Sequence, residues 1–230
     1  MFHVKHLILK ILKDKTMTEK DKMLAGQFYE PNDRELTLLR QQAHQLSFKY
    51  NQTQETDIDL RNNILQILLP NAENGSYLQG PIQFDYGIFT YIGKNFYANF
   101  NLTVLDCCPI TIGDNVLIGP NCCLTTAMHP LLSRERNPQQ RSDGSFFIQE
   151  YAKPILIGSN CWIASNVTIC GGATIGEHCV IGAGSVVTRD IPSYSLAAGV
   201  PCKVIRKITE KDSIQFNQQP RRSTSGALFL

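Results

Sequence analysis

The sequence predicts an all-β solenoid, a parallel β-helix preceded by a small helical unit. The main observation is a six-residue repeat that runs from Ile155 to Ile191. Gly or Ala follows four of the repeated isoleucines, as a tight corner requires. A period of six fits neither an α-helix nor a flat strand, and three such units close one β-helix coil of about 18 residues. The repeated positions form one aliphatic column and one column of mostly small or aliphatic residues: Ile157, Ile163, Ile169, Ile175, Ile181 and Val187, and Ile155, Cys161, Val167, Ala173, Cys179, Ser185 and Ile191.

A second stretch of the same repeat lies earlier in the chain, within residues 82–124. It shifts phase at Cys107-Cys108-Pro109, so one corner must differ from the others. The repeat then stops until Ile155, and the polar residues 125–154 must leave the solenoid as a long loop. Long loops on regular scaffolds are usually functional or mobile. The two stretches together predict about four to five coils.

Sequence patterns typical of helix starts lie before the solenoid, in residues 18–70. Cap patterns predict three helices, which follow Thr18 (with Asp21), Asn32 or Asp33, and Thr56 (with Asp59). These helices lack a convincing core of their own, so we expect them to pack against the solenoid. The predicted organisation is an N-terminal extension (1–17), a helical unit (18–72), a β-helix domain (73–206) with the inserted loop (125–154), and a C-terminal helix and tail (207–230), the helix capped by Thr209.

The composition narrows the function classes. The formal net charge is +2, so the overall charge gives no reason to expect a nucleic-acid partner. Residues 1–16 mix apolar and lysine side chains but are too short to cross a membrane; a loose extension is the main interpretation, and a membrane-surface role is the alternative. The eight cysteines include no C-x-x-C unit, and Cys161 and Cys179 fall in a repeat column. We therefore expect buried free thiols and a reducing, cytoplasmic compartment.

Function in a repeat solenoid must come from a place where the repeat breaks. The sharpest break is residues 125–130, which include His129 at the root of the long loop. Histidine transfers protons near neutral pH, and a rigid stack would hold it in place. From position alone, a histidine that only caps the coil is an equally good interpretation. His178 lies at a turn and His44 lies off the apolar stripe of its helix, so we expect both to be exposed without function.

Other motifs go beyond what a solenoid needs. They are Asp85-Tyr86-Gly87, Ile92-Gly93, the run from Asn95 to Asn101, Ile112-Gly113-Asp114-Asn115-Val116, His129-Pro130, Cys161-Trp162-Ile163, the run from Gly182 to Thr188, Asp190-Ile191-Pro192 and Ala198-Gly199-Val200-Pro201. In the helical unit they are Thr18-Glu19-Lys20, Met23, Ala25-Gly26 and Tyr29. Together these motifs resemble the hexapeptide-repeat sugar O-acetyltransferases, the maltose and galactoside O-acetyltransferases. The resemblance covers residues 18–212, nearly everything except the two ends.

The resemblance implies a left-handed β-helix, an exception to the usual right-handed crossover, and a homotrimer with active sites between subunits. It also implies acetyl transfer from acetyl-CoA to a sugar hydroxyl, which attacks the thioester directly. The histidine that matches the general base of these enzymes is His129. The other matching positions are sugar contacts at Asp33, Asp85, Asn99 and Asp106, and contacts to CoA at Trp162, Ser165, Thr188, Arg189, Lys203 and Arg206. No metal is expected.

The residue types agree with these roles. A base near neutral pKa that assists hydroxyl attack typically contributes ~10²–10⁴ in rate, and the basic cluster suits the phosphates of CoA. Without the resemblance, we would interpret the basic cluster (Arg189, Lys203 and Arg206) as the ordinary solvent-exposed end of a solenoid. Trp162 would then pack at the edge of a coil, and Asp85 and Asp106 would be polar residues at corners or caps.

Aromatic residues flank the repeat and support the expected trimer, because exposed aromatic patches usually mark interfaces. These residues are Phe96, Tyr97, Phe100 and Trp162.

Two departures from the family leave the acceptor open. The loop between His129 and Trp162 is longer than in the galactoside enzymes, and Cys107 stands where those enzymes have a second acidic residue. Maltose, glucose, a galactoside or a lipo-oligosaccharide would all fit a slot for a hydroxyl group.

Two other function classes compete with the acetyltransferase. A metal enzyme like the γ-class carbonic anhydrases needs a histidine cluster around zinc, but the solenoid contains only His129 and His178. An inactive trimeric binding or scaffold protein is the other alternative. A nucleotidyltransferase is excluded, because the helical unit is too short for a nucleotide-binding α/β domain.

Overall fold

The structure, a computed structural model, describes residues 17–214. Residues 1–16 of the predicted extension and 215–230 of the predicted tail lie outside the described residues. The helices are α2 (Glu19–Leu24), α3 (Arg34–Asn51), α4 (Ile58–Leu68), α5 (Ser133–Arg136) and the 3₁₀ helix η1 (Glu210–Asp212). The strands are β1 (Tyr77–Leu78), β2 (Ile82–Phe84), β3 (Thr90–Ile92), β4 (Tyr97–Ala98), β5 (Leu102–Leu105), β6 (Ile110–Ile112), β7 (Leu117–Ile118), β8 (Cys123–Thr125), β9 (Ala127–Met128), β10 (Gln139–Gln140), β11 (Phe146–Phe147), β12 (Tyr151–Ala152), β13 (Ile155–Ile157), β14 (Trp162–Ile163), β15 (Thr168–Cys170), β16 (Thr174–Ile175), β17 (Val180–Ile181), β18 (Val186–Val187), β19 (Ser195–Ala198) and β20 (Lys203–Lys207).

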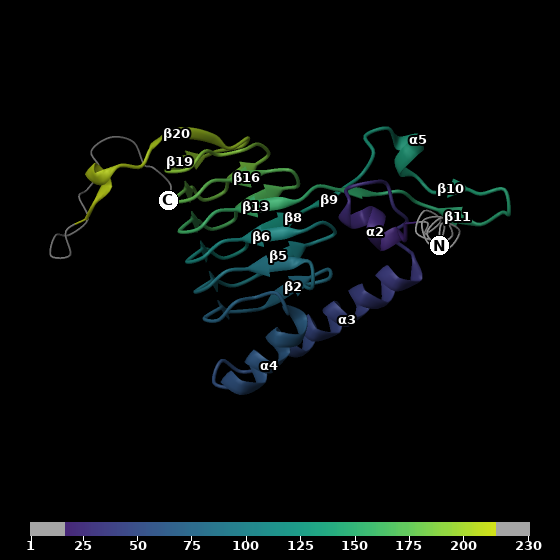
Figure 1. The fold of residues 1–230 in the computed structure, drawn as a ribbon, viewed down its shortest axis with the longest axis horizontal. Coiled ribbons are helices and arrows are strands. Elements are labelled where there is room, and N and C mark those ends of the chain that lie inside the picture. The colour runs from purple at the N-terminus through teal and green to yellow at the C-terminus, as the bar shows by residue number, and fades with distance from the viewer. Residues whose placement is uncertain (1–16, 215–230) are drawn as a thin grey trace, which may run out of the picture.

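Three sheets form the walls of a solenoid, and the chain visits them in turn (Figure 1). The four-stranded sheet has the order β16-β13-β6-β3, and the five-stranded sheet has the order β18-β15-β8-β5-β2. The seven-stranded sheet has the order β1-β4-β7-β14-β17-β19-β20, in which β20 alone pairs antiparallel. Six parallel strands in this sheet correspond to about six turns within residues 17–214. The prediction of four to five coils was therefore too low, because the stack extends to β1 and β19, beyond the recognisable repeat.

The predicted aliphatic column fills the interior of the solenoid. Each of its members, from Ile157 to Val187, is at most 1% exposed. Successive coils stack in register, as the pairing of Trp162 with Val180 and of Ile163 with Ile181 shows. Burying one such aliphatic side chain contributes about 1.5–3 kcal/mol, so the column supplies a continuous core along the stack.

One corner of the solenoid is larger than the others. Tyr97 and its partner Leu117 are 20 residues apart in the first coils, whereas Trp162 and Val180 are 18 apart. The larger connections are residues 85–89 and 106–109, between the five-stranded and the four-stranded sheets. The phase shift predicted at 107–109 is confirmed. The matching shift at 85–89 escapes the sequence pattern, because the recognisable repeat begins only after it.

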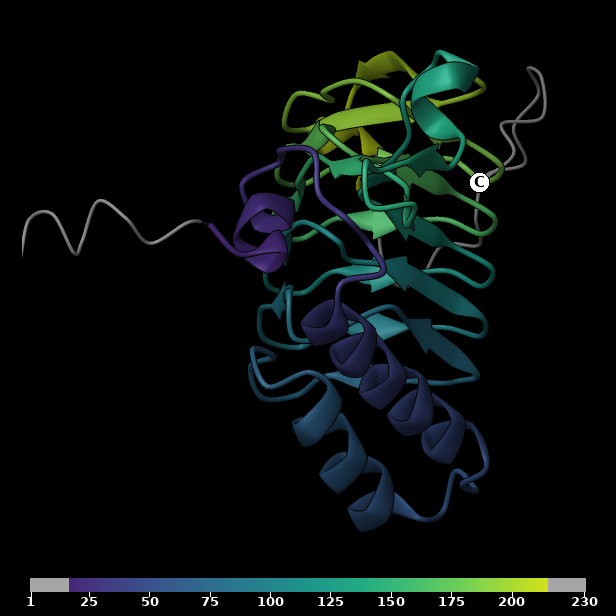
Figure 2. The ribbon, with the colours of Figure 1, turned by 90° about the vertical axis from the view of Figure 1, so that its right-hand side faces the viewer.

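The helical unit packs against the first coils (Figures 1 and 2). Side chains of α3 and α4 join the core of the solenoid, as expected for helices without a core of their own. Arg61 of α4 is buried and donates hydrogen bonds to the carbonyl oxygens of Leu78 at 2.7 Å and Gln79 at 2.9 Å, and to the hydroxyl of Tyr50 at 2.7 Å. These bonds satisfy backbone groups at the open end of the stack, which would otherwise lack partners.

The predicted caps are confirmed in part. Thr18 and Asp21 form a capping box, and Asp33 caps α3. The N-cap of α4 is Asp57 rather than Thr56, and its carboxylate accepts a bond from the backbone of Gln54 instead of capping the helix. The predicted C-terminal helix is limited, within the described residues, to the single turn η1.

The predicted loop 125–154 has its own secondary structure. Its two ends pair as the antiparallel strands β9 and β12, and α5 and the hairpin β10–β11 reach away from the stack (Figure 1). The segment between α2 and α3 meets the returning strand, where Tyr29 and Glu150 form an antiparallel bridge. Two segments far apart in sequence therefore meet beside the enlarged corner.

Side-chain exposure corrects one aromatic prediction. Phe96 is 1% exposed and belongs to the core, because it points into the coil and needs no partner subunit to cover it. Phe100 and Trp162 are exposed, as predicted. Among residues 17–214, each helix is too short or too polar to cross a membrane.

Candidate active site

His129 and Glu150 face each other at the root of the long loop. The pairing of Met128 with Tyr151 between β9 and β12 places the two residues next to each other. His129 Nδ1 lies 3.8 Å from Glu150 Oε1. The histidine side chain is 52% exposed and the glutamate side chain 18%, so one face of the imidazole is open while the carboxylate lies behind it.

Tyr29 holds Glu150 in place. The Tyr29 hydroxyl donates to Glu150 Oε2 at 3.0 Å, and the two backbones exchange hydrogen bonds of 2.9 and 3.1 Å. Burial raises the pKa of Tyr29 well above its ordinary value, so the phenol keeps its proton and remains a donor. The two carboxylate oxygens therefore have different partners, a phenol on one side and an imidazole on the other.

Asp85 lies at the same corner and faces helix α3. Its Oδ1 is 3.6 Å from Nε2 of His44, and its Oδ2 accepts a weak bond from the thiol of Cys107 at 3.8 Å. Burial raises the pKa of Asp85, and the contact with His44 opposes that rise. The histidine that sequence patterns treat as exposed without function thus contacts a predicted site residue.

Cys107 is buried between Tyr29 and Asp85. Burial raises the pKa of its thiol to about 12, with nearby carboxylates adding to the effect. The thiol is therefore neutral at physiological pH and serves as a weak donor rather than as a nucleophile.

Asp106 and Asp33 are hydrogen-bonded within the chain. Asp106 is fully buried and accepts bonds from the backbone N–H of Tyr86 at 2.8 Å and the hydroxyl of Thr90 at 2.9 Å, which ties the two enlarged connections together. Burial raises the pKa of Asp106. Asp33 accepts bonds from the backbone of Glu35 and Leu36 at the start of α3.

Three further predicted residues share a groove of about 260 Å³ along the seven-stranded sheet. Asn99, Trp162 and Ser165 line it, together with apolar residues of β4 and β7. Trp162 is 40% exposed, and Asn99 accepts a bond from the backbone of Phe100 at 2.7 Å. The groove extends from the seven-stranded sheet onto the turns that lead to the five-stranded sheet, whereas the corner of His129 joins the five-stranded and the four-stranded sheets.

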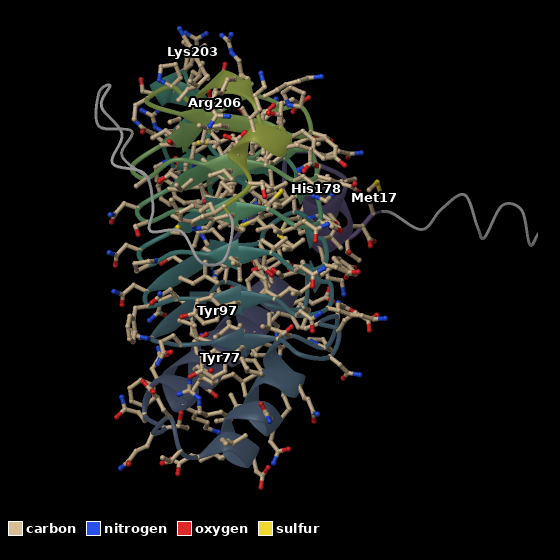
Figure 3. The ribbon with its side chains drawn as sticks, turned by 90° about the vertical axis from the view of Figure 1, so that its left-hand side faces the viewer. Met17, Tyr77, Tyr97, His178, Lys203 and Arg206 are labelled. Atoms are coloured by element: carbon tan, nitrogen blue, oxygen red, sulfur yellow. The ribbon has the colours of Figure 1, made fainter. Side chains whose placement is uncertain are left out.

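The remaining predicted CoA contacts, three of them basic, lie at the last coils. Thr188 and Arg189 follow β18 and are exposed, and Lys203 and Arg206 lie on β20. Figure 3 shows Lys203 and Arg206 at the end of the solenoid away from Tyr77 and the helical unit. Arg206 pairs with Asp212 at 2.7 Å. Apart from Asp33 at the start of α3, the predicted site residues of one chain therefore form three groups. They are a corner group (Asp85, Asp106 and His129), a sheet group (Asn99, Trp162 and Ser165) and an end group (Thr188, Arg189, Lys203 and Arg206).

Sequence patterns assign no site role to Glu150, Tyr29 or His44, which the structure brings to this corner. Glu150 lies just before the repeat resumes, but nothing in the repeat distinguishes it from other polar loop residues. Its partner Tyr29 is 121 residues away, so no local pattern connects the two. Only the folded corner brings them together.

The corner group has the chemistry of a general base. A neutral imidazole with one open face and a carboxylate behind it can accept a proton from a bound hydroxyl group. In residues 17–214 no cluster of three or more His, Cys, Asp or Glu side chains is arranged to hold a metal ion.

Comparison with known proteins identifies the family. The maltose acetyltransferase hexapeptide capping motif matches residues 22–72, the bacterial transferase hexapeptide model (six repeats) matches residues 154–189, and a hexapeptide repeat of succinyl-transferase matches residues 109–126. Galactoside O-acetyltransferase from Escherichia coli (strain K12) is 40% identical over 196 residues, which cover 85% of this chain and 91% of the relative.

Two solved structures are similar over most of the chain. A maltose O-acetyltransferase from Clostridium difficile 630 is 42% identical, with a TM-score of 0.77, covering 84% of this chain and 99% of the other. A galactoside acetyltransferase in complex with coenzyme A is 36% identical, with a TM-score of 0.80, covering 91% of this chain and all of the other. The predicted left-handed solenoid is the fold of this family. The chain belongs to the hexapeptide-repeat acetyltransferases that carry the maltose acetyltransferase capping motif, beside the galactoside and maltose O-acetyltransferases.

Proposed function

We propose that the protein transfers the acetyl group of acetyl-CoA to a hydroxyl of a sugar of the maltose, glucose or galactoside type. The observation that carries the proposal is the half-exposed imidazole of His129 with the carboxylate of Glu150 at 3.8 Å behind it. Asp85 lies at the same corner, where a polar acceptor would need hydrogen-bonding partners. The relatives named for galactoside and maltose acetylation support the choice of acceptor class.

His129 acts as the general base in a single transfer step. Its Nε2 removes the proton of the sugar hydroxyl while the hydroxyl oxygen forms a bond to the thioester carbon. The carbon–sulfur bond then breaks, and the leaving thiolate takes the proton from the imidazolium. Products are the acetylated sugar and CoA with a free thiol, and no acetyl-enzyme forms.

We further propose that the working unit is a homotrimer. In one chain the sheet group lies on the seven-stranded sheet and the turns that follow it, away from the corner of His129 between the other two sheets. A neighbouring copy would bring its sheet group, Asn99, Trp162 and Ser165, towards the corner of His129. The exposed apolar residues of the seven-stranded sheet, Tyr77, Leu117 and Trp162, would be covered in the same assembly. Acetyl-CoA would lie between the copies, with its phosphates near the cationic residues of the end group.

Release of free thiol from acetyl-CoA tests the proposal. The purified protein is assayed with maltose, glucose, a galactoside and a lipo-oligosaccharide, and product masses are measured. We expect release that depends on at least one sugar, together with a product heavier by one acetyl group. Release without a sugar would indicate hydrolysis of the thioester instead. Absence of sugar-dependent release across the panel would contradict the proposed function and favour a binding or scaffold role in a cytoplasmic trimer.

A further inference from the structure

We propose that Glu150, held by Tyr29, is the positioning residue of the base His129. The inference rests on the proposed function for its kinetic part, because it assigns His129 the proton transfer. It concerns a residue that neither the repeat nor the motifs single out. Its basis is the geometry of three side chains from three separate segments of the chain.

The backbone of Glu150 is fixed independently of its side chain. It exchanges two hydrogen bonds with Tyr29, and its neighbours in β12 pair with β9. The rings of Phe28 and Tyr151 meet at 5.4 Å beside this bridge, and Arg141 of the β10–β11 hairpin pairs with Glu30 at 3.2 Å. The carboxylate therefore projects from a point that the helical unit holds against the loop.

The two oxygens of Glu150 are used in different directions. Oε2 accepts the Tyr29 hydroxyl at 3.0 Å, which leaves Oε1 facing Nδ1 of His129 at 3.8 Å. A solvated surface carboxylate would be free to turn, but this one is largely covered and its second oxygen is held. Catalytic hydrogen bonds are often long in the absence of substrate and shorten when it binds.

This arrangement selects one form of the imidazole. A proton on Nδ1 can point at the carboxylate, which leaves the lone pair of Nε2 available for the sugar hydroxyl. When Nε2 takes the proton, the ring becomes positive beside a negative group, so the attraction increases in the transition state. Glu150 touches neither substrate nor the reacting atoms, and it acts through His129.

Kinetics of Glu150→Gln test the assignment. Glutamine keeps the size of the side chain but removes its charge. We expect kcat to fall by at least ~10-fold with the KM values for both substrates nearly unchanged, because the lost interaction acts mainly in the transition state. Tyr29→Phe should lower kcat in the same direction by a smaller factor. Glu135→Gln, on the exposed helix α5 of the same loop, is the matched control and should leave kcat unchanged.

A double variant separates positioning from a general structural effect. In the His129→Ala background, Glu150→Gln should cause no further loss of the residual rate, because there is no imidazole left to position. An equal fold-loss in both backgrounds would overturn the proposal, as would a Glu150→Gln enzyme that keeps its kcat.

The nitrogen-15 spectrum of the imidazoles gives a readout that needs no activity. The His129 signals, assigned by comparison with His129→Asn, should show a proton mainly on Nδ1 in the wild type and a mixed population in Glu150→Gln. An identical pattern in both proteins would contradict the positioning role. If the wild type acetylated no sugar, the proposed function would fail while this spectrum still decided whether Glu150 orients His129.

Discussion

At the scale of single residues, three carboxylates at one corner differ because their surroundings differ. Glu150 has a phenol on one oxygen and an imidazole near the other. Asp106 is fully buried and joins two connections of the solenoid. Asp85 is the one with a thiol and a half-exposed histidine as partners, and it keeps some access to solvent. We therefore expect Asp85 to meet the acceptor, with Asp106 supporting the corner from within.

His44 should influence acceptor binding through Asp85. The variant His44→Ala removes a partner 3.6 Å from the carboxylate, and the pair is worth at most about 0.5–1 kcal/mol because the histidine is exposed to solvent. We expect the KM for the sugar to rise ~2- to 5-fold, with kcat and the KM for acetyl-CoA changed less. Gln45→Ala, the next residue of α3, is the control. If steady-state kinetics show the same sugar KM for both variants, His44 has no part in the acceptor site.

At the scale of elements, the sequence predicts the features that depend on the repeat or on near neighbours, and contacts between distant segments decide the rest. The column from Ile157 to Val187 and the caps at Thr18 and Asp33 follow from residue spacing, because each depends on neighbours within one coil or one helical turn. The extra turns at both ends could not be predicted, since their residues depart from the aliphatic pattern.

The site was predictable only where a motif marks it. His129 and Trp162 lie in motifs that resemble those of the family, and the basic residues lie beside such motifs, so the sequence alone points to them as candidates. The pairing of Tyr29 with Glu150 joins segments 121 residues apart, and it depends on how the helical unit and the loop meet at the enlarged corner. The contact of His44 with Asp85 is of the same kind.

The contact between α4 and the enlarged corner requires glycine at position 87. Gly87 has φ of 71°, and an added Cβ would overlap the carbonyl oxygen of Leu68 at the end of α4. Gly144 has φ of 85° in the exposed hairpin, where an added Cβ would meet nothing within 4 Å. Both Ala variants carry the backbone strain of about 1 kcal/mol, but only Gly87→Ala also displaces the helix.

Thermal melts of the two variants separate strain from displacement. Gly144→Ala should lower Tm by ~2–4 °C, the shift expected for about 1 kcal/mol in a chain of this size. Gly87→Ala should lower it by clearly more. Equal shifts would mean that the end of α4 does not need the close approach at this corner.

At the scale of the whole molecule, one chain separates the groups that the proposed reaction would use. The corner group and the sheet group lie at different parts of the solenoid wall, and the end group lies at the last coils. In the proposed trimer, the corner of one copy would meet the sheet group of the next, and exposed aromatic residues would be covered at the same time. We therefore propose that acetyl transfer takes place in the assembly, with His129 as the residue on which its chemistry depends.

The most direct measurement is the kcat of His129→Ala in a folded trimer. Light scattering should give about three times 25.8 kDa for both wild type and variant. The variant should melt like the wild type, because His129 is half exposed and outside the core. We predict a kcat at least ~10² lower, with the KM for acetyl-CoA changed far less, since a general base acts in the transition state. A folded, trimeric variant that keeps most of its kcat would show that His129 is not the base.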